Sequence, residues 1–300
     1  MVSPFVSVII PVYNDQERFN KCLQGLARQT YSSDLFEVLA VDNGSTPPIC
    51  TAPDAPTNTL YLTESTPGSY AARNRALSEA RGDILAFTDS DCIPDERWIE
   101  NGVHAVSKLS GPGLIAGRID VHFKDPAHPT WVELHEREFA FRQNENAARF
   151  HYGATANVFA PRTVFDKVGL FDASLKSGGD REWGNRVFNA GFTVAYADDV
   201  RVQHPARHSA GEYISKLRRI VHGHYALRHH PDKRHLCRMS NTLRGFLPPR
   251  KEWASIGQSG ASLTLLEKLK IAGFVVTKRY YANLLRLKLL LLGENKNTPR

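Results

Sequence analysis

Apolar and polar positions form alternating blocks along the first ninety residues. Runs rich in apolar residues predict buried strands over residues 6–11, 36–41, 60–62 and 83–88. Between them, apolar side chains at helical spacing predict helices over residues 15–29 and 69–80. This alternation predicts an α/β fold with a largely parallel sheet and right-handed crossovers.

The pattern loosens after about residue 110. It predicts a helix over 131–142, a glycine-bearing segment over 151–159, a helix over 181–190 and a strand over 193–196. Beyond residue 208 the chain becomes helical and basic. We therefore expect a catalytic domain over 1–208 and a basic helical region over 209–300.

Charge is distributed unevenly over the 300 residues. The net charge of +7 combines −8 for residues 1–200 with +15 for residues 201–300. An acidic body with a basic tail predicts an anionic partner for the last hundred residues. It argues against a broad nucleic-acid-binding face, and no RNP, zinc-finger or clear helix-turn-helix pattern is present, so no nucleic-acid partner is expected.

Other classes are excluded by short patterns. The first strand runs into Pro11 rather than GxGxxG, which removes the dehydrogenase fingerprint. Four cysteines, at positions 22, 50, 92 and 237, form no CxxC pair, so a reducing compartment is expected. Residues 1–11 lack the basic segment and the long apolar run of a targeting signal, so we do not expect them to be one, and no run of about 18 uncharged apolar residues predicts a membrane span. We expect a cytoplasmic protein.

Candidate chemistry falls at the predicted carboxyl ends of strands, where ligands bind in such sheets. Asp89-Ser90-Asp91 follows the strand over 83–88, and paired carboxylates there suit Mg²⁺ or Mn²⁺ carrying a diphosphate. A solvated turn is the alternative. Asp42 ends the second strand and could accept a base N–H, or could form an Asx turn.

Two further segments offer charged side chains near helix starts. Arg73 follows small residues and could bind phosphate bidentately, or could form a surface salt bridge. Gly178-Gly179-Asp180 opens the helix that carries Glu182 and Trp183. Asp180 could be a general base beside a glycine loop, or an N-cap.

The order of these motifs resembles family 2 glycosyltransferases over about residues 5–205. The resemblance rests on Ser7–Asn14, Val41–Ser45, Ala72–Asn74, Asp89–Asp91, Gly153–Asn157 with Val168–Asp172, and Gly179–Trp183. It implies a GT-A fold, a mixed sheet flanked by helices, and a nucleotide-diphosphate sugar donor.

The resemblance also implies roles for individual residues. Donor or acceptor contacts fall on Pro11, Tyr13, Asn14, Asp42, Arg73, Asp89, Ser90, Asn157, Glu182 and Trp183. Asp91 would be the main ligand of Mn²⁺ or Mg²⁺, with Asp89 and His204, and Asp180 the catalytic base. His204 could equally be a surface histidine. A single aspartate follows the glycines, so Glu182 competes for the role of base.

We therefore predict an inverting, metal-dependent enzyme that transfers one sugar per encounter, since the Gln-x-x-Arg-Trp motif of processive relatives is absent. A UDP-sugar is slightly favoured, and the acceptor is expected to be a glycan or lipid-linked saccharide in surface polysaccharide, glycolipid or lipid-linked oligosaccharide synthesis. A nucleotidyltransferase-like enzyme and a non-catalytic binding protein using the basic third are the alternatives.

The last forty residues are both leucine-rich and basic. Residues 262–292 predict one or two helices in which Lys and Arg interrupt an apolar pattern, as in helices that lie on membranes. We expect peripheral contact with the inner face of the plasma membrane. The alternatives are a helix packed on the catalytic domain or a dimer contact.

Overall fold

The computed structural model describes residues 3–52, 54–229, 246–258 and 263–292. These form two compact units: unit 1 is Met1–Asp120 with Phe141–Pro205, and unit 2 is Val121–Ala140 with Ala206–Arg300. Residues 121–140 thus group with the C-terminal region, whereas the sequence prediction of 1–208 and 209–300 kept them with the first domain. Parts of the predicted basic region, 230–245, 259–262 and 293–300, lie outside the described residues.

Unit 1 is built on an eight-stranded mixed sheet with the order β3-β2-β1-β4-β7-β6-β8-β5. Its strands are β1 (Val6–Val12), β2 (Phe36–Asp42), β3 (Thr59–Thr63), β4 (Ile84–Thr88), β5 (Ile93–Pro94), β6 (Gly113–His122), β7 (Asn157–Pro161) and β8 (Thr193–Pro205). β1 pairs in parallel with β2 and β4, and β2 with β3, whereas β4–β7, β6–β7 and β5–β8 are antiparallel. The α/β fold is confirmed, but the sheet is less parallel than the early strands predict.

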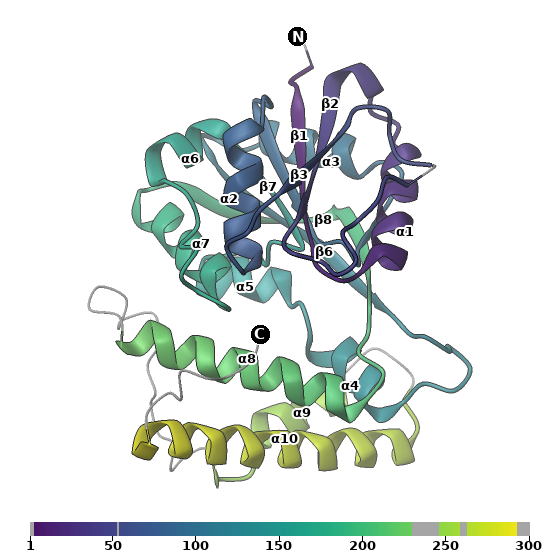
Figure 1. Cartoon of the computed structure of the whole chain (residues 1–300). Coiled ribbons are helices and arrows are strands. Elements are labelled where there is room, and N and C mark those ends of the chain that lie inside the picture. Colours follow the sequence, from purple (N-terminus) through teal and green to yellow (C-terminus); the bar gives the residue numbers. More distant parts are fainter. Residues whose placement is uncertain (1–2, 53, 230–245, 259–262, 293–300) are drawn as a thin grey trace. The chain divides into compact units, whose positions relative to one another are not determined.

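Helices cover this sheet and bury apolar side chains against it. They are α1 (Gln16–Ala27), α2 (Ser69–Glu79), α3 (Trp98–Ser107), α5 (Gln143–Phe150), α6 (Arg162–Val168) and α7 (Gly179–Asn189), with a short 3₁₀ turn at Ser33–Leu35. Figure 1 shows α2, α6 and α7 on one side of the sheet and α1 on the other. The strands β1, β2 and β4 between them are almost wholly buried.

The described residues of unit 2 include the helices α4 (Trp131–Phe139), α8 (Ala210–His229), α9 (Arg250–Gln258) and α10 (Leu265–Leu292). The predicted helix over 131–142 ends at Phe139 instead, because Ala140 adopts an extended backbone. Leu134, Ile256, Ile271 and Val275 form one of its small apolar cores. Among the described helices, none combines the length and the apolarity that crossing a bilayer requires.

Candidate active site

The predicted polar clusters meet at one edge of the unit 1 sheet. Asp42 is the last residue of β2, in register with Val12 of β1, and Asp89, Ser90 and Asp91 directly follow β4. Since β1, β2 and β4 are parallel neighbours, their carboxyl ends lie along the same edge. The strand pattern therefore brings together side chains that are almost fifty positions apart.

The loop after β2 is held by Asp42. Its Oδ1 accepts the Ser45 N–H at 2.9 Å, and its Oδ2 accepts the Ile49 N–H at 3.2 Å. The turn expected from the sequence is therefore present. Each carboxylate oxygen keeps a second lone pair, so Asp42 can still accept a hydrogen bond from a base.

Asn14 closes the neighbouring loop after β1. It adopts a left-handed backbone (φ 51°), donates its N–H to the Ser45 hydroxyl oxygen at 2.9 Å, and accepts the Thr46 N–H on Oδ1 at 2.7 Å. Tyr13 beside it is 47% exposed. Pro11 lies within β1 and is partly buried.

Arg73 is buried on α2 and pairs with the carboxylate of Asp89. Its Nη2 donates to Asp89 Oδ1 at 2.5 Å, and its buried Nε has no hydrogen-bond partner. The surface salt bridge considered from the sequence is excluded, because Arg73 is 3% exposed. Arg73 thus holds the first carboxylate of the pair in place, and it keeps one unused donor.

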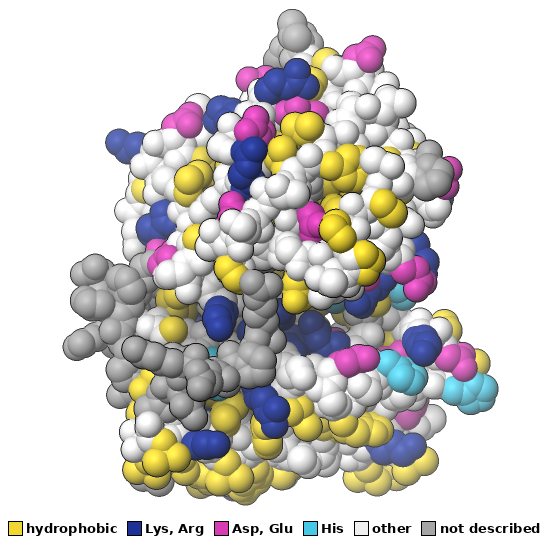
Figure 2. All heavy atoms as spheres, in the orientation of Figure 1, with side chains coloured by type: hydrophobic (Ala, Val, Ile, Leu, Met, Phe, Trp, Pro, Cys, Tyr) yellow, Lys and Arg dark blue, Asp and Glu magenta, His cyan; other side chains and the backbone are white. Residues whose placement is uncertain are grey.

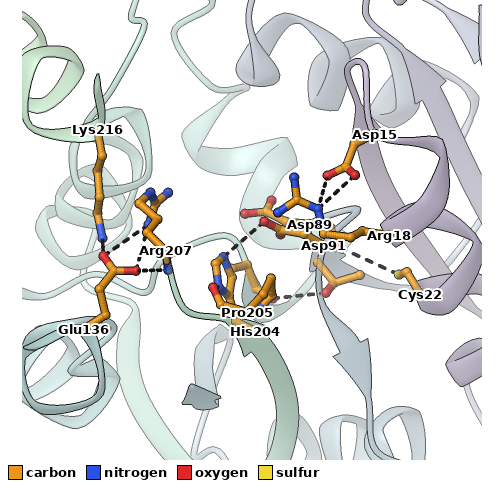
Figure 3. Close-up of polar contacts among 12 residues, drawn as sticks. Asp15, Arg18, Cys22, Asp89, Asp91, Glu136, His204, Pro205, Arg207 and Lys216 are labelled. Atoms are coloured by element: carbon orange, nitrogen blue, oxygen red, sulfur yellow. Dashed lines mark hydrogen bonds and ion pairs between the residues drawn. The ribbon is translucent and has the colours of Figure 1, made fainter. Parts of the chain in front are cut away.

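Asp91 faces His204, which β8 carries to the same edge. His204 Nδ1 lies 2.7 Å from the Pro205 carbonyl oxygen, which can only accept, so Nδ1 must carry the proton. In the neutral ring the lone pair of Nε2 then faces Asp91 Oδ2 at 3.5 Å (Figure 3). Two electron-rich atoms in this arrangement are suited to a shared cation, and an anchored Nδ1–H is typical of metal-binding histidines. His204 is buried, so it is not a surface histidine.

Cys92 is the third group near this pair, and the sequence analysis did not single it out. Its sulfur and ligand atoms of Asp91 and His204 all lie within 4.8 Å of one another. Burial, with the neighbouring charges of Asp91 and Asp89, raises the pKa of the Cys92 thiol well above its ordinary value. A protonated thiol is a poor ligand for hard cations, so Asp91 and His204 are the better donors for Mg²⁺ or Mn²⁺.

Asp180 lies in the first turn of α7. Tyr70 of α2 accepts the Gly179 N–H at 2.9 Å and donates its hydroxyl to Asp180 Oδ1 at 3.3 Å. Gly178 has a left-handed backbone (φ 83°), and a Cβ on Gly179 would come within 2.7 Å of the Tyr70 ring. Both glycines are therefore required for this close approach.

Burial is the main influence on the Asp180 carboxyl and raises its pKa. The Arg181 N–H, the charge of Arg73 and the Tyr70 hydroxyl oppose this shift, and the charge of Asp89 adds to it. The pKa of Asp180 therefore depends on the charges of Arg73 and Asp89. A carboxylate with a raised pKa, in reach of a second charged pair, has the properties of a general base.

Glu182, the competing base, is buried in a bidentate ion pair. Arg186 Nε donates to its Oε1 at 2.8 Å and Nη2 to its Oε2 at 3.0 Å. Arg186 also donates to the Val168 and Leu170 carbonyls. Trp183 is buried, donates from Nε1 to the Gly169 carbonyl and stacks on Phe165 at 4.3 Å. Both side chains thus join α7 to the preceding loop, and their contact with substrate stays a prediction.

Asn157 at the start of β7 is fully buried. Its Oδ1 accepts the Trp98 indole N–H at 2.9 Å, and its Nδ2 donates to the carbonyls of Arg118 and Val200. These bonds connect α3, β6 and β8 through one amide. Asn157 therefore positions the strand that carries His204, and direct contact with an acceptor stays a prediction.

Unit 2 holds a separate buried charge cluster around Glu136. Lys216 Nζ lies 2.6 Å from Glu136 Oε1, and Arg207 Nη1 lies 3.2 Å from Oε2 (Figure 3). Burial raises the pKa of Glu136, but the charges of Lys216 and Arg207 outweigh it, so the pKa of this carboxyl is lowered. The Glu136 carboxylate of α4 thus binds both Lys216 of α8 and Arg207 in the segment before α8.

Known proteins are similar to this chain in sequence and in fold. A family model described as Glycosyl transferase family 2 matches residues 7–169, more than half of the chain. The chain belongs to glycosyltransferase family 2. The relative "Glycosyltransferase AglE" of Haloferax volcanii is 34% identical, and the match covers 98% of each chain. The pre-mycofactocin glycosyltransferase of Mycobacterium tuberculosis is 27% identical over 76% of this chain and 48% of its own.

Solved structures confirm the GT-A fold of this family 2 chain. A mannosyltransferase from Pyrobaculum calidifontis, in complex with GDP-Man and Mn²⁺, has a TM-score of 0.63 at 20% identity and covers 98% of this chain and 89% of its own. S. aureus TarS in complex with UDP-GlcNAc has a TM-score of 0.54 at 15% identity, with 98% of each chain covered. The protein is therefore a glycosyltransferase that uses a nucleotide sugar, and the nucleotidyltransferase and non-catalytic alternatives are set aside.

Proposed function

We propose that this protein is an inverting, metal-dependent enzyme that transfers one sugar from a nucleotide-diphosphate sugar to an acceptor hydroxyl. The observation that carries the proposal is the pair of sites at one sheet edge. Asp91 and His204 face each other at 3.5 Å, and Asp180 has a pKa raised by burial and influenced by Asp89. A cation site for the leaving diphosphate and a base for the incoming hydroxyl are the two parts that this reaction needs.

Asp91 and His204 would hold the cation, with Asp89 beside them. The chemistry of these side chains suits a cation, because the Pro205 carbonyl fixes the His204 proton on Nδ1 and leaves the Nε2 lone pair available to bind the metal. When bound, Mn²⁺ or Mg²⁺ supplies positive charge that favours departure of the nucleoside diphosphate. Arg73, which is buried against Asp89, keeps that carboxylate in position.

Asp180 would accept the proton of the acceptor hydroxyl. That oxygen forms a bond to the anomeric carbon as the bond from this carbon to the diphosphate oxygen breaks. The nucleoside diphosphate takes the bonding electrons, and attack from the opposite face inverts the configuration. Glu182 is less suited to this role because Arg186 already binds both of its carboxylate oxygens.

The donor's nucleoside would bind beside Pro11, Tyr13, Asn14 and Asp42. Asp42 can still accept a hydrogen bond from a base N–H. Tyr13, in the loop directly after β1, is exposed. UDP-sugars are slightly favoured by resemblance alone. GDP-sugars stay open, since one structural neighbour is in complex with GDP-Man and another with UDP-GlcNAc.

The acceptor would be a glycan or a lipid-linked saccharide, in the synthesis of surface polysaccharide, glycolipid or lipid-linked oligosaccharide. The basic, leucine-rich C-terminal region supports a place on the cytoplasmic face of the plasma membrane. Unit 1 would supply the residues of the reaction.

A donor panel tests the proposal. Purified protein is incubated with Mn²⁺ and UDP-, GDP- or dTDP-sugars plus a mixture of glycan and lipid-linked acceptors, and the released nucleotide is identified. We expect a nucleoside diphosphate from one donor class and a product whose anomeric configuration is opposite to that of the donor. Release of pyrophosphate, or a product with retained configuration by NMR, would contradict the proposal.

A further inference from the structure

Helix α10 has two apolar faces, although a packed surface helix needs only one. Its inner face is buried in unit 2 through Ile271, Phe274, Val275, Ala282 and Leu289. The opposite face is apolar as well and is open to solvent. Its leucines include Leu265 at 74% exposure and Leu291 at 80%.

Exposed apolar side chains form one continuous stripe along α10. The stripe contains Leu265, Leu266, Leu269, Tyr280, Leu284 and Leu291, and Leu290 and Leu292 are further exposed leucines at the end of the helix. Along most of the helix their spacing is three or four residues or a multiple of it, and Val276 and Leu287 fill the longer intervals at partial exposure. The stripe covers the helix from end to end, roughly 40 Å at 1.5 Å per residue. An apolar surface of this length is unusual for a face that remains in water.

Basic side chains line both edges of this stripe. Lys270 and Lys288, both exposed, lie 18 residues apart and therefore on the same side of the helix. Arg279 and Arg286 lie along the other edge. From residue 268 to residue 292 the chain has six basic and no acidic residues. In Figure 2, yellow side chains gather along the lower edge, where Figure 1 places α10, with dark blue ones among them.

We infer that the outward stripe of α10 docks flat on an anionic lipid surface. Its leucines would enter the acyl boundary while Lys270 and Lys288 meet lipid phosphates. A second copy of the chain is the less suitable occupant, because two such faces would bring the exposed Lys270 and Lys288 of one helix close to the same lysines of the other. The inference goes beyond the transfer reaction and names the surface, the side chains and the kind of partner.

Vesicle flotation of the full chain tests the inference without any nucleotide sugar. We expect binding to phosphatidylcholine vesicles that contain phosphatidylglycerol, and little binding to phosphatidylcholine alone. Leu269→Ser/Leu284→Ser/Leu291→Ser should weaken binding by more than about 100-fold, since burial of each leucine contributes about tenfold or more. The matched control is Leu60→Ser/Leu170→Ser, which replaces two exposed leucines of unit 1 and should bind like the wild type.

A second pair of variants separates charge from apolar contact. Lys270→Gln/Lys288→Gln should weaken binding to the anionic vesicles by roughly 30-fold, about fivefold for each lysine. Lys108→Gln/Lys176→Gln removes two exposed lysines of unit 1 and should have no effect. All replaced side chains are exposed, so circular dichroism and the melting temperature should stay at wild-type values.

Three results would overturn the inference. The wild type could fail to float with anionic vesicles at low salt. The triple leucine variant could bind as tightly as the wild type. Sedimentation could reveal a dimer that the triple variant dissociates while no lipid binding occurs, which would make the stripe a contact between two copies. None of these measurements depends on the donor or on Asp180, so they stand apart from the test of sugar transfer.

Discussion

The hydroxyl of Tyr70 connects α2 to the carboxylate of Asp180. It accepts the Gly179 N–H at 2.9 Å and donates to Asp180 Oδ1 at 3.3 Å. Tyr70 and Asp180 are 110 residues apart in the chain. The bond fixes the carboxylate at the start of α7 and stabilises its charged form. Tyr70 is therefore a positioning residue for the proposed base.

Tyr70→Phe should lower kcat roughly tenfold and leave the KM for the donor nearly unchanged, because one hydrogen bond to a charged group is lost. Steady-state kinetics with the accepted nucleotide sugar measures both values. Tyr31→Phe is the matched control, since it removes a hydroxyl that donates to the Pro4 carbonyl elsewhere in unit 1. Equal losses in both variants would assign the effect to general destabilisation.

Asp180→Asn should reduce transfer by about 10²- to 10⁴-fold, the usual contribution of general-base assistance, while donor binding persists. Glu182→Gln should behave differently, because it breaks a buried ion pair with Arg186. It should lower the melting temperature and retain most activity per folded molecule. Near wild-type transfer by Asp180→Asn, together with an inactive but stable Glu182→Gln, would reverse the assignment of the base.

The pH dependence of kcat/KM should report the Asp180 carboxyl. Its pKa is raised from the ordinary 3.8, mainly by burial, and a base acts only when deprotonated, so activity should fall as pH drops through this raised value. Tyr70→Phe should move the acid limb to higher pH, since the Tyr70 hydroxyl lowers this pKa. An acid limb unchanged by Tyr70→Phe would argue that another group titrates.

Stability at low pH should depend on Glu136 in unit 2. Its pKa is lowered from the ordinary 4.5, because Lys216 and Arg207 together outweigh burial. The ionised form is thus favoured in the folded state, and its stabilisation is present above about pH 4.5 and lost as pH falls through the lower folded value.

Glu136→Gln should accordingly cost about 3 kcal/mol in the free energy of unfolding at neutral pH, since two cations lose a buried partner. The loss should shrink in acid. Glu79→Gln, which removes one member of an exposed pair with Arg75, should cost under about 1 kcal/mol. Denaturant unfolding at several pH values measures these differences, and similar losses in the two variants would contradict the role of Glu136.

The sequence predicts the part of the fold in which local pattern and burial agree. β1, β2 and β4 are short runs rich in apolar residues, and each forms a strand within one or two residues of its expected bounds. β6 and α3 were not predicted. β6 changes from fully buried to partly exposed along its length, so it has neither a continuous run nor a regular alternation. Its partner β7 comes from a distant part of the chain.

The candidate site likewise has some features that the local sequence predicts and others that depend on tertiary contacts. The motifs bring Asp42, Asp89 and Asp91 to one sheet edge, and strand order alone is enough to expect this. The hydrogen bond of Tyr70 to Asp180 and the proximity of Cys92 to His204 depend on tertiary contacts that no spacing reveals. The same holds for Asn157 and Trp183, which lie within family-like motifs but use their polar atoms for internal hydrogen bonds.

The most direct test of the proposed site is the metal dependence of nucleoside diphosphate release from the accepted sugar nucleotide, measured in the wild type and in Asp91→Ala. We expect EDTA to abolish release by the wild type, Mn²⁺ or Mg²⁺ to restore it, and Asp91→Ala to stay inactive at every metal concentration while remaining folded. Full release by the wild type in EDTA, or by Asp91→Ala with metal, would contradict the assignment of Asp91 and His204 as the cation site.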